Sequence, residues 1–247
     1  SVLPGAAVCV LLFAISVPAQ VSPHNPHVPR GPGPWFEGWY TRVSDAEGGR
    51  SVAVICASHL PKGQSYEPNA SLPGYINVLV SEGNGAPTYS YFAFPRHTLR
   101  RMKGDWVRPT SDFSAPAEFE WTAEGVGRVT ESSVDVTLPG QVSVRIDTSG
   151  RIPWNWRVPE AGPEGWLALL PVPLHWYVHS LGSEATYEVT VWDEQGNPEP
   201  VQGVGYAHLE KNWQTEFPEG WVWIQGHAAN NEAQIVGSVA DVNLVGE

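Results

Sequence analysis

The chain has 247 residues, with 14 Lys and Arg against 26 Asp and Glu, which gives a formal net charge of −12. Because 42% of the residues are hydrophobic and only 16% are charged, the chain can bury a core, which excludes an intrinsically disordered protein. The acidic excess and the lack of a Lys/Arg cluster argue against a nucleic acid as partner. The 12 Trp residues indicate recognition of apolar rings, sugars or cations.

The N-terminal segment has the pattern of a targeting sequence. No charged residue precedes Arg30, and an apolar run over residues 6–17 is followed by Val17-Pro18-Ala19, which suits cleavage after Ala19. We therefore predict a removable segment over residues 1–19 that directs the chain to the secretory route or to a plastid, and a β domain over residues 20–247. The alternative is a buried strand.

Neither end of the sequence looks like a natural terminus. The chain opens with Ser and its only Met is Met102, so the natural start is expected upstream. Residues 235–247 alternate like a strand and then stop, which predicts a domain cut short at its C-terminus.

The two cysteines do not predict a disulfide. Cys9 lies in the targeting segment, and Cys56 lies in an apolar run that predicts a buried strand thiol. The tripeptide Asn69-Ala70-Ser71 is a glycosylation acceptor if the protein is secreted.

The remaining sequence predicts an all-β protein. Short β-rich runs recur with Gly- and Pro-rich turns between them, and no stretch has a sustained helical period. The predicted strands cover residues 51–57, 75–81, 88–94, 118–122, 133–138, 142–147, 166–170, 175–180, 186–192, 204–210, 221–227 and 234–242. Such a pattern is typical of a β-barrel or sandwich. The Pro- and Gly-rich segment 150–173 is either the boundary between two β sub-domains or a long crossing loop.

The first candidate acid is Glu37. In an extended strand, Trp35, Glu37 and Trp39 share one face. A carboxyl group between two indoles loses water, which raises its pKa and keeps it protonated, as a general acid requires. The alternative is a surface Glu beside two core Trp side chains.

The second candidate acid is Glu210. Tyr206, His208, Glu210 and Asn212 are expected on one strand face, and a second strand carries alternating aromatic and polar side chains, namely Trp221, Trp223, Gln225 and His227. If the two strands form a hairpin, polar and aromatic groups line one wall, which suits a site that stabilises a developing cation. The alternative is a hydrophobic core with a polar rim.

Histidine spacing does not predict a metal. His175 and His179 on a strand would lie on the order of 13 Å apart, too far to share one ion. His24 and His27 lie in a Pro-rich loop without ligand partners nearby in the sequence, and no G-x-S-x-G turn indicates a nucleophilic triad.

At these residues the sequence resembles the tocopherol cyclase family. The resemblance is carried by seven blocks: Pro23-His24 with His27, Phe36-Glu37-Gly38-Trp39-Tyr40 with Arg42-Val43, Leu174-His175-Trp176, Gly205-Tyr206-Ala207, Glu210-Lys211-Asn212-Trp213, Phe217-Pro218, and Trp221-Val222-Trp223-Ile224-Gln225. In order and spacing they cover nearly all of the chain after the apolar segment. The run Gln214-Thr215-Glu216 stands where the family pattern leads us to expect Gly-rich residues after Asn-Trp.

The resemblance implies a lipocalin-like β-barrel or sandwich in two parts and cyclisation of a prenylated hydroquinone to a chromanol without a cofactor. In that reaction Glu37 or Glu210 would be the acid, and His175, Tyr206, Asn212 and Gln225 would orient the phenol or accept its proton. A further set of side chains would shield the cation or bind the substrate: Trp39, Tyr40, Trp213, Trp221 and Trp223. Related lipocalin-like enzymes hydrate isoprenoid double bonds or fold polyenes, so an alkene hydratase is one alternative. A carrier of an apolar ligand or a carbohydrate-binding module is another.

The expected partner is a small apolar substrate of the prenyl-quinol type. A peripheral contact with a membrane or lipid droplet would give access to it. The sequence makes no prediction of the oligomeric state.

Overall fold

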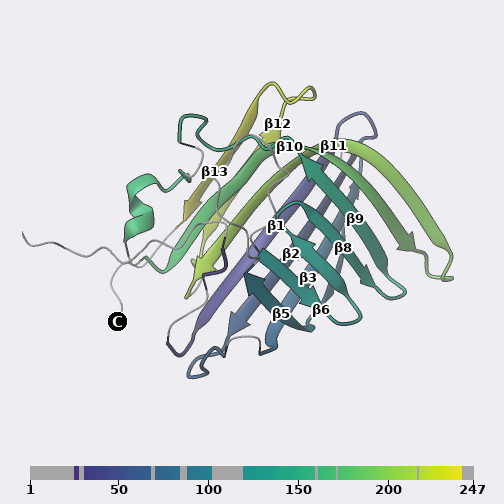
Figure 1. Ribbon diagram of the computed structural model, residues 1–247. Coiled ribbons are helices and arrows are strands. Elements are labelled where there is room, and N and C mark those ends of the chain that lie inside the picture. The colour runs from purple at the N-terminus through teal and green to yellow at the C-terminus, as the bar shows by residue number, and fades with distance from the viewer. Residues whose placement is uncertain are drawn as a thin grey trace, which may run out of the picture.

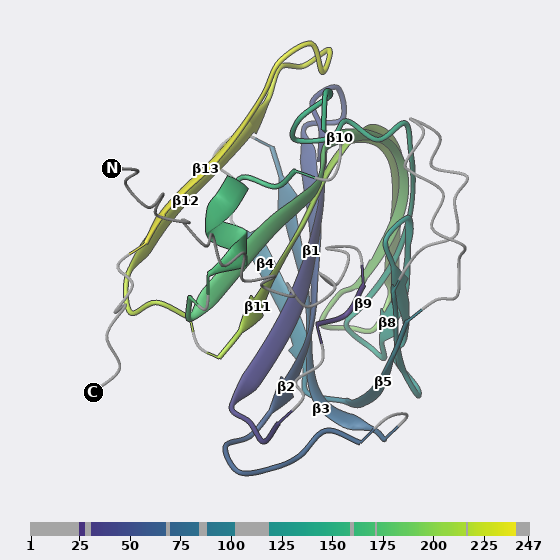
Figure 2. The same ribbon diagram turned by 60° about the vertical axis from the view of Figure 1, so that its left-hand side comes forward.

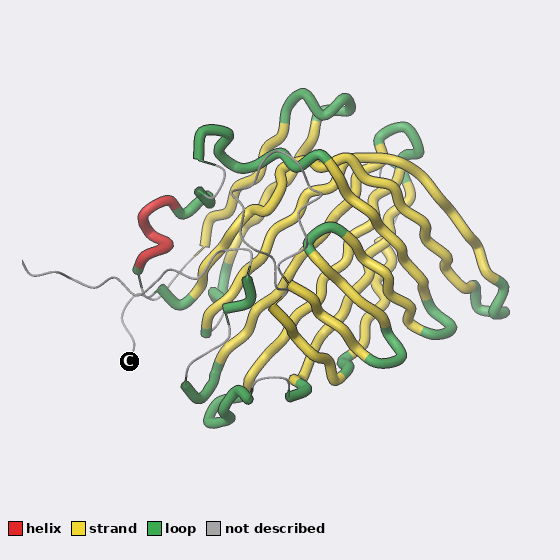
Figure 3. Tube along the Cα trace, viewed as in Figure 1, coloured by secondary structure: helices red, strands yellow, loops and turns green. Residues whose placement is uncertain are grey.

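The computed structural model describes residues 25–27, 31–67, 70–83, 88–101, 119–158, 161–170, 172–215 and 217–240. Within these ranges the chain is built almost entirely from antiparallel strands (Figures 1 and 3). The elements are β1 (Trp35–Asp45), β2 (Arg50–Leu60), β3 (Leu72–Glu82), β4 (Thr88–Ala93), β5 (Arg96–Arg101), β6 (Phe119–Ala123), β7 (Gly127–Thr130), β8 (Ser133–Leu138), β9 (Val142–Ser149), η1 (Gly165–Leu169), β10 (Leu174–Trp192), β11 (Pro198–Gln214), β12 (Trp221–His227) and β13 (Gln234–Ala240).

Eleven strands form one sheet in the order β2-β1-β11-β10-β9-β8-β7-β6-β5-β3-β4. An additional pairing of β2 with β3 closes this sheet on itself, so the predicted all-β, lipocalin-like architecture is confirmed. The hairpin of β12 and β13 is a separate two-stranded sheet that lies outside the barrel, beside β10 (Figures 1 and 2).

The barrel interior holds the hydrophobic core. Along β1 every second side chain is buried, and Trp35, Trp39 and Val43 pack among Val, Ile and Leu side chains of the other strands. The Trp39 indole stacks on Phe119 at 4.5 Å between ring centroids. Cys56 is fully buried, as predicted, and burial raises the pKa of its thiol.

One predicted strand is wrong. Residues 166–169 belong to the 3-10 helix η1 (Gly165–Leu169), and Leu170 follows it. The positive φ of 55° at Gly165 turns the chain at its start, and the short run has no period-two alternation to hold it in a sheet. Two other predicted runs, 175–180 and 186–192, form the single strand β10, whose pairing with β11 shifts register between Val178 and Ser183.

The segment 150–173 connects two neighbours in the sheet. β9 and β10 pair directly, from Glu184 opposite Ser149 to Val191 opposite Val142. The connection is therefore a long excursion that leaves and rejoins the same sheet. The predicted targeting segment 1–19, His24 and Asn69 lie outside the described residues. Separately, none of the described helices has the length and apolar character needed to cross a membrane.

Gln214 has a backbone φ of 146°, in the region that favours glycine. It is the first residue of the run 214–216, where the family pattern leads us to expect Gly-rich residues. We therefore expect Gln214→Gly to raise the free energy of unfolding by roughly 1 kcal/mol, because the strain disappears. Urea denaturation measures the change. A neutral or destabilising result would mean that the side chain of Gln214 compensates for the strain.

His97 should make the fold sensitive to acid. Its ring is buried, its Nε2 lies 2.7 Å from Ser58 Oγ, and burial lowers its pKa to about 4. In the unfolded chain this histidine takes up a proton near pH 6.5, whereas in the folded protein it stays neutral down to about pH 4. The free energy of unfolding therefore has its full value above pH 6.5 and decreases as the pH falls towards 4. Between pH 7 and 4.5 the loss should be roughly 2 kcal/mol.

The measurement is the free energy of unfolding at both pH values. His97→Gln should reduce the difference by that amount. Equal pH dependence in the variant and the wild type would contradict the assignment.

Candidate functional site

The two candidate acids lie on opposite faces of the sheet. In the pairing of β1 with β11, Glu37 is opposite Trp213 and Tyr40 is opposite Glu210. Because side chains alternate along a strand, Glu37 points into the barrel and Glu210 points to the outer face, towards β12. The structure therefore contains two separate clusters rather than one site with two carboxyl groups.

The inner cluster is built around Lys211. The Nζ atom of Lys211 lies 2.7 Å from Glu37 Oε1, 2.8 Å from the carbonyl oxygen of Asn25 and 3.0 Å from His27 Nδ1. Both Lys211 and Glu37 are fully buried. The backbone N–H of His27 donates to Glu37 Oε2 at 2.8 Å, so the cluster ties the segment 25–27 to the barrel interior.

The prediction that Glu37 stays protonated is wrong. Trp35, Glu37 and Trp39 do share the inner face, and burial alone would raise the pKa of Glu37. However, the charge of Lys211 and the hydrogen bonds from His27 and Lys211 outweigh burial and lower the pKa. An ionised carboxylate that already holds an ammonium group is a poor general acid. The sequence could not reveal this partner, since 174 positions separate Glu37 from Lys211.

Two predicted site residues, His175 and Trp213, belong to this inner side. The Trp213 ring stacks between His27, at 4.2 Å, and His175, at 5.2 Å. His175 Nδ1 lies 2.9 Å from Glu164 Oε2, and Glu164 Oε1 accepts the backbone N–H of Trp176 at 2.7 Å. Burial and the charge of Lys211 lower the pKa of His27, which keeps its imidazole neutral.

The outer cluster lines an apolar pocket of about 440 Å³ between the barrel and the β12–β13 hairpin. Its walls come from seven strands and from the loop before β12. The lining residues are Phe36, Gly38, Trp39, Tyr40, Ile55, Ala57, Tyr75, Leu174, Trp176, Glu210, Asn212, Phe217, Pro218, Trp221, Trp223 and Ser238. Glu210 contributes the only carboxyl group among them, and the volume lies in the range of small-molecule sites.

Three nitrogen atoms surround one oxygen of Glu210. Trp176 Nε1–H donates to Oε2 at 2.8 Å, Trp223 Nε1–H donates at 3.2 Å, and His208 Nε2 lies at 3.0 Å. His208 is fully buried, and its Nδ1 has no hydrogen-bond partner. Because all three described contacts fall on Oε2, Oε1 is the oxygen left for a ligand.

Tyr40 supplies a hydroxyl group in the same pocket. Burial raises its pKa to about 12, with nearby Arg42 acting against the shift and Glu210 adding to it. The phenol therefore stays neutral and can donate a hydrogen bond. Its ring contacts Trp223 edge-on at 5.5 Å between centroids.

The hairpin of β11 with β12 considered from the sequence does not form, because β12 pairs with β13 and β11 pairs with β1 and β10. The two expected walls still meet, since Trp223 reaches across to Glu210. Five predicted binding residues line the pocket: Trp39, Tyr40, Asn212, Trp221 and Trp223. Of these, Trp39 is mostly a core side chain. Gln225 lies further along β12, where its Oε1 accepts from Arg42 Nη1 at 3.3 Å.

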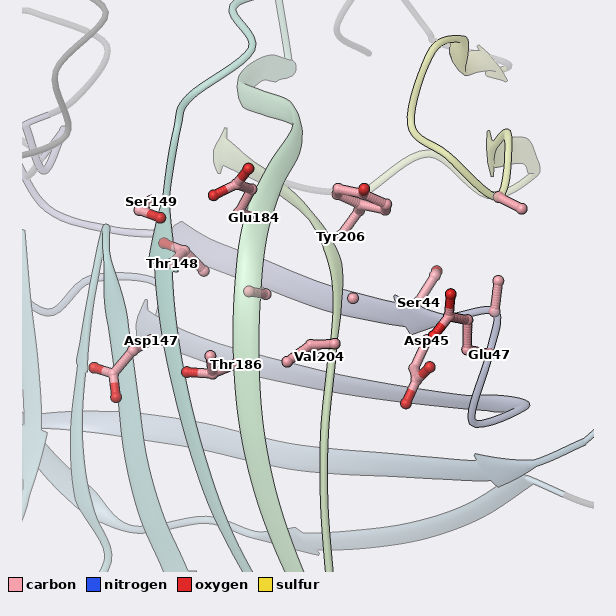
Figure 4. Close-up of a pocket in the computed structure, with 14 residues that line it drawn as sticks. Ser44, Asp45, Glu47, Asp147, Thr148, Ser149, Glu184, Thr186, Val204 and Tyr206 are labelled. Carbon is pink, nitrogen blue, oxygen red and sulfur yellow. The ribbon is translucent and has the colours of Figure 1, made fainter.

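Tyr206 lies apart from Glu210, in a second pocket of about 470 Å³ (Figure 4). Four carboxyl groups line that pocket, from Asp45, Glu47, Asp147 and Glu184. Figure 4 shows Asp147 and Glu184 on one side and Asp45 with Glu47 on the other, so the four groups do not converge on one point. Among the described residues, no group of three or more His, Cys, Asp or Glu side chains could hold a metal ion.

Three residues of the clusters received no role from the sequence, although His208 was expected on the strand face of Glu210. Trp176 and His208 hold Glu210, and Lys211 neutralises Glu37. The alternation along β11 indicates that Lys211 points away from Glu210, but it does not identify Glu37 as its partner. No sequence signal places Trp176 beside Glu210, since that contact depends on the register of β10 with β11.

Comparison with known proteins identifies the fold alone. No protein-family model matches the chain, and no curated protein sequence gives a significant match. The crystal structure of CghA aligns with a TM-score of 0.51 and 12% identity, over 89% of this chain and 66% of CghA. A Nitrosomonas europaea protein provisionally described as ATTH aligns with a TM-score of 0.34 and 14% identity, over 77% of this chain and 56% of that protein. The chain thus shares its fold with CghA and spans just under two thirds of CghA's length.

Proposed function

We propose that the protein is a cofactor-independent cyclase that closes a prenylated hydroquinone to a chromanol, with Glu210 as the acid. The observation that carries the proposal is the placement of Glu210, a single carboxyl group in an aromatic pocket with one oxygen held by Trp176, Trp223 and His208. The resemblance of the sequence to tocopherol cyclases supports the substrate class.

The reaction is an isomerisation. Glu210 gives its proton to the less substituted carbon of the prenyl double bond, which leaves a tertiary cation on the neighbouring carbon. The phenol oxygen attacks this cation, a C–O bond closes the ring, and the phenol proton returns to Glu210. No atom enters or leaves.

The pocket offers the groups that these steps need. The rings of Tyr40, Trp221 and Trp223 line the pocket and would stabilise the cation with their electron-rich faces. The amide of Asn212 and the neutral hydroxyl of Tyr40 can hydrogen-bond the hydroquinone oxygens. The apolar walls limit access of water, which would otherwise capture the cation.

The test is incubation of the purified protein with a prenyl hydroquinone, followed by mass spectrometry of the product. A product with the mass of the substrate and one ring more supports the cyclase. A product that gains one water identifies an alkene hydratase. Binding without turnover identifies a carrier, and either of these two results would overturn the proposal.

A further inference from the structure

The connection between β9 and β10 exposes large apolar side chains to an unusual degree. Trp156 is 76% exposed and Trp166 is 69% exposed, and Leu167 and Leu170 are exposed beside Trp166. Exposure of apolar indole surface to water is unfavourable, so such groups often mark a surface that a partner covers. Trp is enriched at interfaces between an apolar and a polar phase. We call these four residues the indole loop.

The indole loop lies next to the mouth of the apolar pocket. Trp154, just before Trp156, contacts the pocket residue Trp176 edge-on at 6.4 Å between centroids. The 3-10 helix η1 leads into β10, whose first residue, Leu174, also lines the pocket. In Figures 1 and 2, η1 lies beside the beginning of β10, on the side of the molecule that carries the β12–β13 hairpin.

The pocket mouth is itself aromatic and exposed. Phe217 and Trp221 line the pocket and are each about half exposed, at 49% and 56%. Their rings contact each other at 5.6 Å. An apolar ligand leaving the pocket at this rim would therefore meet aromatic side chains rather than charged ones.

Two charged side chains of the described connection, Arg151 and Glu164, are engaged by protein groups, whereas Arg157 is exposed. Arg151 donates to the carbonyl of His179 and to Tyr177, and Glu164 binds His175 and the backbone of Trp176. The guanidinium group of Arg157 lies over the Trp156 ring, 4.9 Å from its centroid, an arrangement that suits the boundary between lipid and water. The chain as a whole carries −12, which disfavours an anionic surface.

We propose that the indole loop docks the pocket mouth onto a zwitterionic phospholipid bilayer, so that an apolar ligand passes between the bilayer and the pocket. Insertion of indole and Leu side chains supplies the attraction, without a polybasic contribution. Binding should therefore be insensitive to salt and should not require anionic lipids. The transfer of a prenyl hydroquinone along this route rests on the proposed function, but the docking does not.

The experiment is co-sedimentation of the protein with phosphatidylcholine vesicles that contain no substrate. The wild type should bind equally at low salt and at about 0.5 M salt. The double variant Trp156→Ser/Trp166→Ser should partition about tenfold more weakly, because two exposed indoles are lost. Tyr89→Ser, which removes a half-exposed aromatic ring from the edge strand β4, should bind like the wild type.

Three results would overturn the docking: absence of vesicle binding by the wild type, binding only to anionic vesicles, or equal binding of the double variant. Self-association through the indole loop without vesicle binding would also overturn it. A second arm separates this failure from failure of the proposed function. The double variant should convert detergent-dispersed prenyl hydroquinone like the wild type and lose most turnover when the substrate is embedded in vesicles. No turnover by the wild type in detergent would count against the proposed function and leave the docking standing.

Discussion

Glu210→Gln is expected to lower kcat for the cyclisation by about 10²- to 10⁴-fold, the contribution typical of a positioned general acid. The substitution should leave the pocket intact. The amide oxygen of Gln can still accept the N–H groups of Trp176 and Trp223, which lie 2.8 and 3.2 Å from the carboxyl oxygen in the wild type. Substrate affinity should therefore change little while turnover is lost.

Single-turnover kinetics and a binding titration measure the two effects separately. Glu184→Gln is the matched control, because it removes a carboxyl group from the second pocket and should leave kcat unchanged. If Glu210→Gln keeps full turnover, or if its loss of turnover is matched by a loss of fold, Glu210 is not the acid.

Lys211→Met should destabilise the fold by about 3–5 kcal/mol, because it leaves the carboxylate of Glu37 buried without its cation. The loss should be largest where Glu37 is ionised. Since the pKa of Glu37 is lowered in the folded protein, its contribution is present above the unfolded value near 4.5 and disappears as the pH falls through the folded value.

The double variant Lys211→Met/Glu37→Met should recover most of this stability, as both buried charges are then absent. Denaturation of the two variants and the wild type measures the recovery. Arg50→Met provides the comparison, since it breaks an exposed pair with Glu82 and should cost less than about 1 kcal/mol. A single variant as stable as the wild type would contradict the assignment of Lys211 as the partner of Glu37.

The sequence predicted the fold class because strand alternation is a local property. The faces of β1 and β11 follow from period two, so the joint burial of Trp35, Glu37 and Trp39 was predictable. The protonation state of Glu37 was not predictable, because it depends on Lys211, which lies far along the chain and arrives through the pairing of β1 with β11. The same holds for Trp176, which β10 brings to Glu210.

The sequence predicted several of the residues that line the apolar pocket, but not the strand pairing that brings them together. The two walls are not joined as a hairpin of β11 with β12, because β12 pairs with β13 and approaches Glu210 from outside the barrel. Turn patterns indicate which strands follow each other, but they do not decide whether consecutive strands pair when another partner is present. Tyr206 shares the strand face of Glu210, yet it lies too far along β11 to reach the same pocket.

Cyclisation in D₂O tests the proton transfer from Glu210 most directly. If an exchangeable acid protonates the prenyl double bond, the chromanol should carry one deuterium that does not wash out, on the ring carbon next to the newly formed C–O carbon. Mass spectrometry and NMR of the product report its number and position. A chromanol without deuterium at that carbon would contradict the account, because the double bond would then have been activated without a proton from an acid such as Glu210.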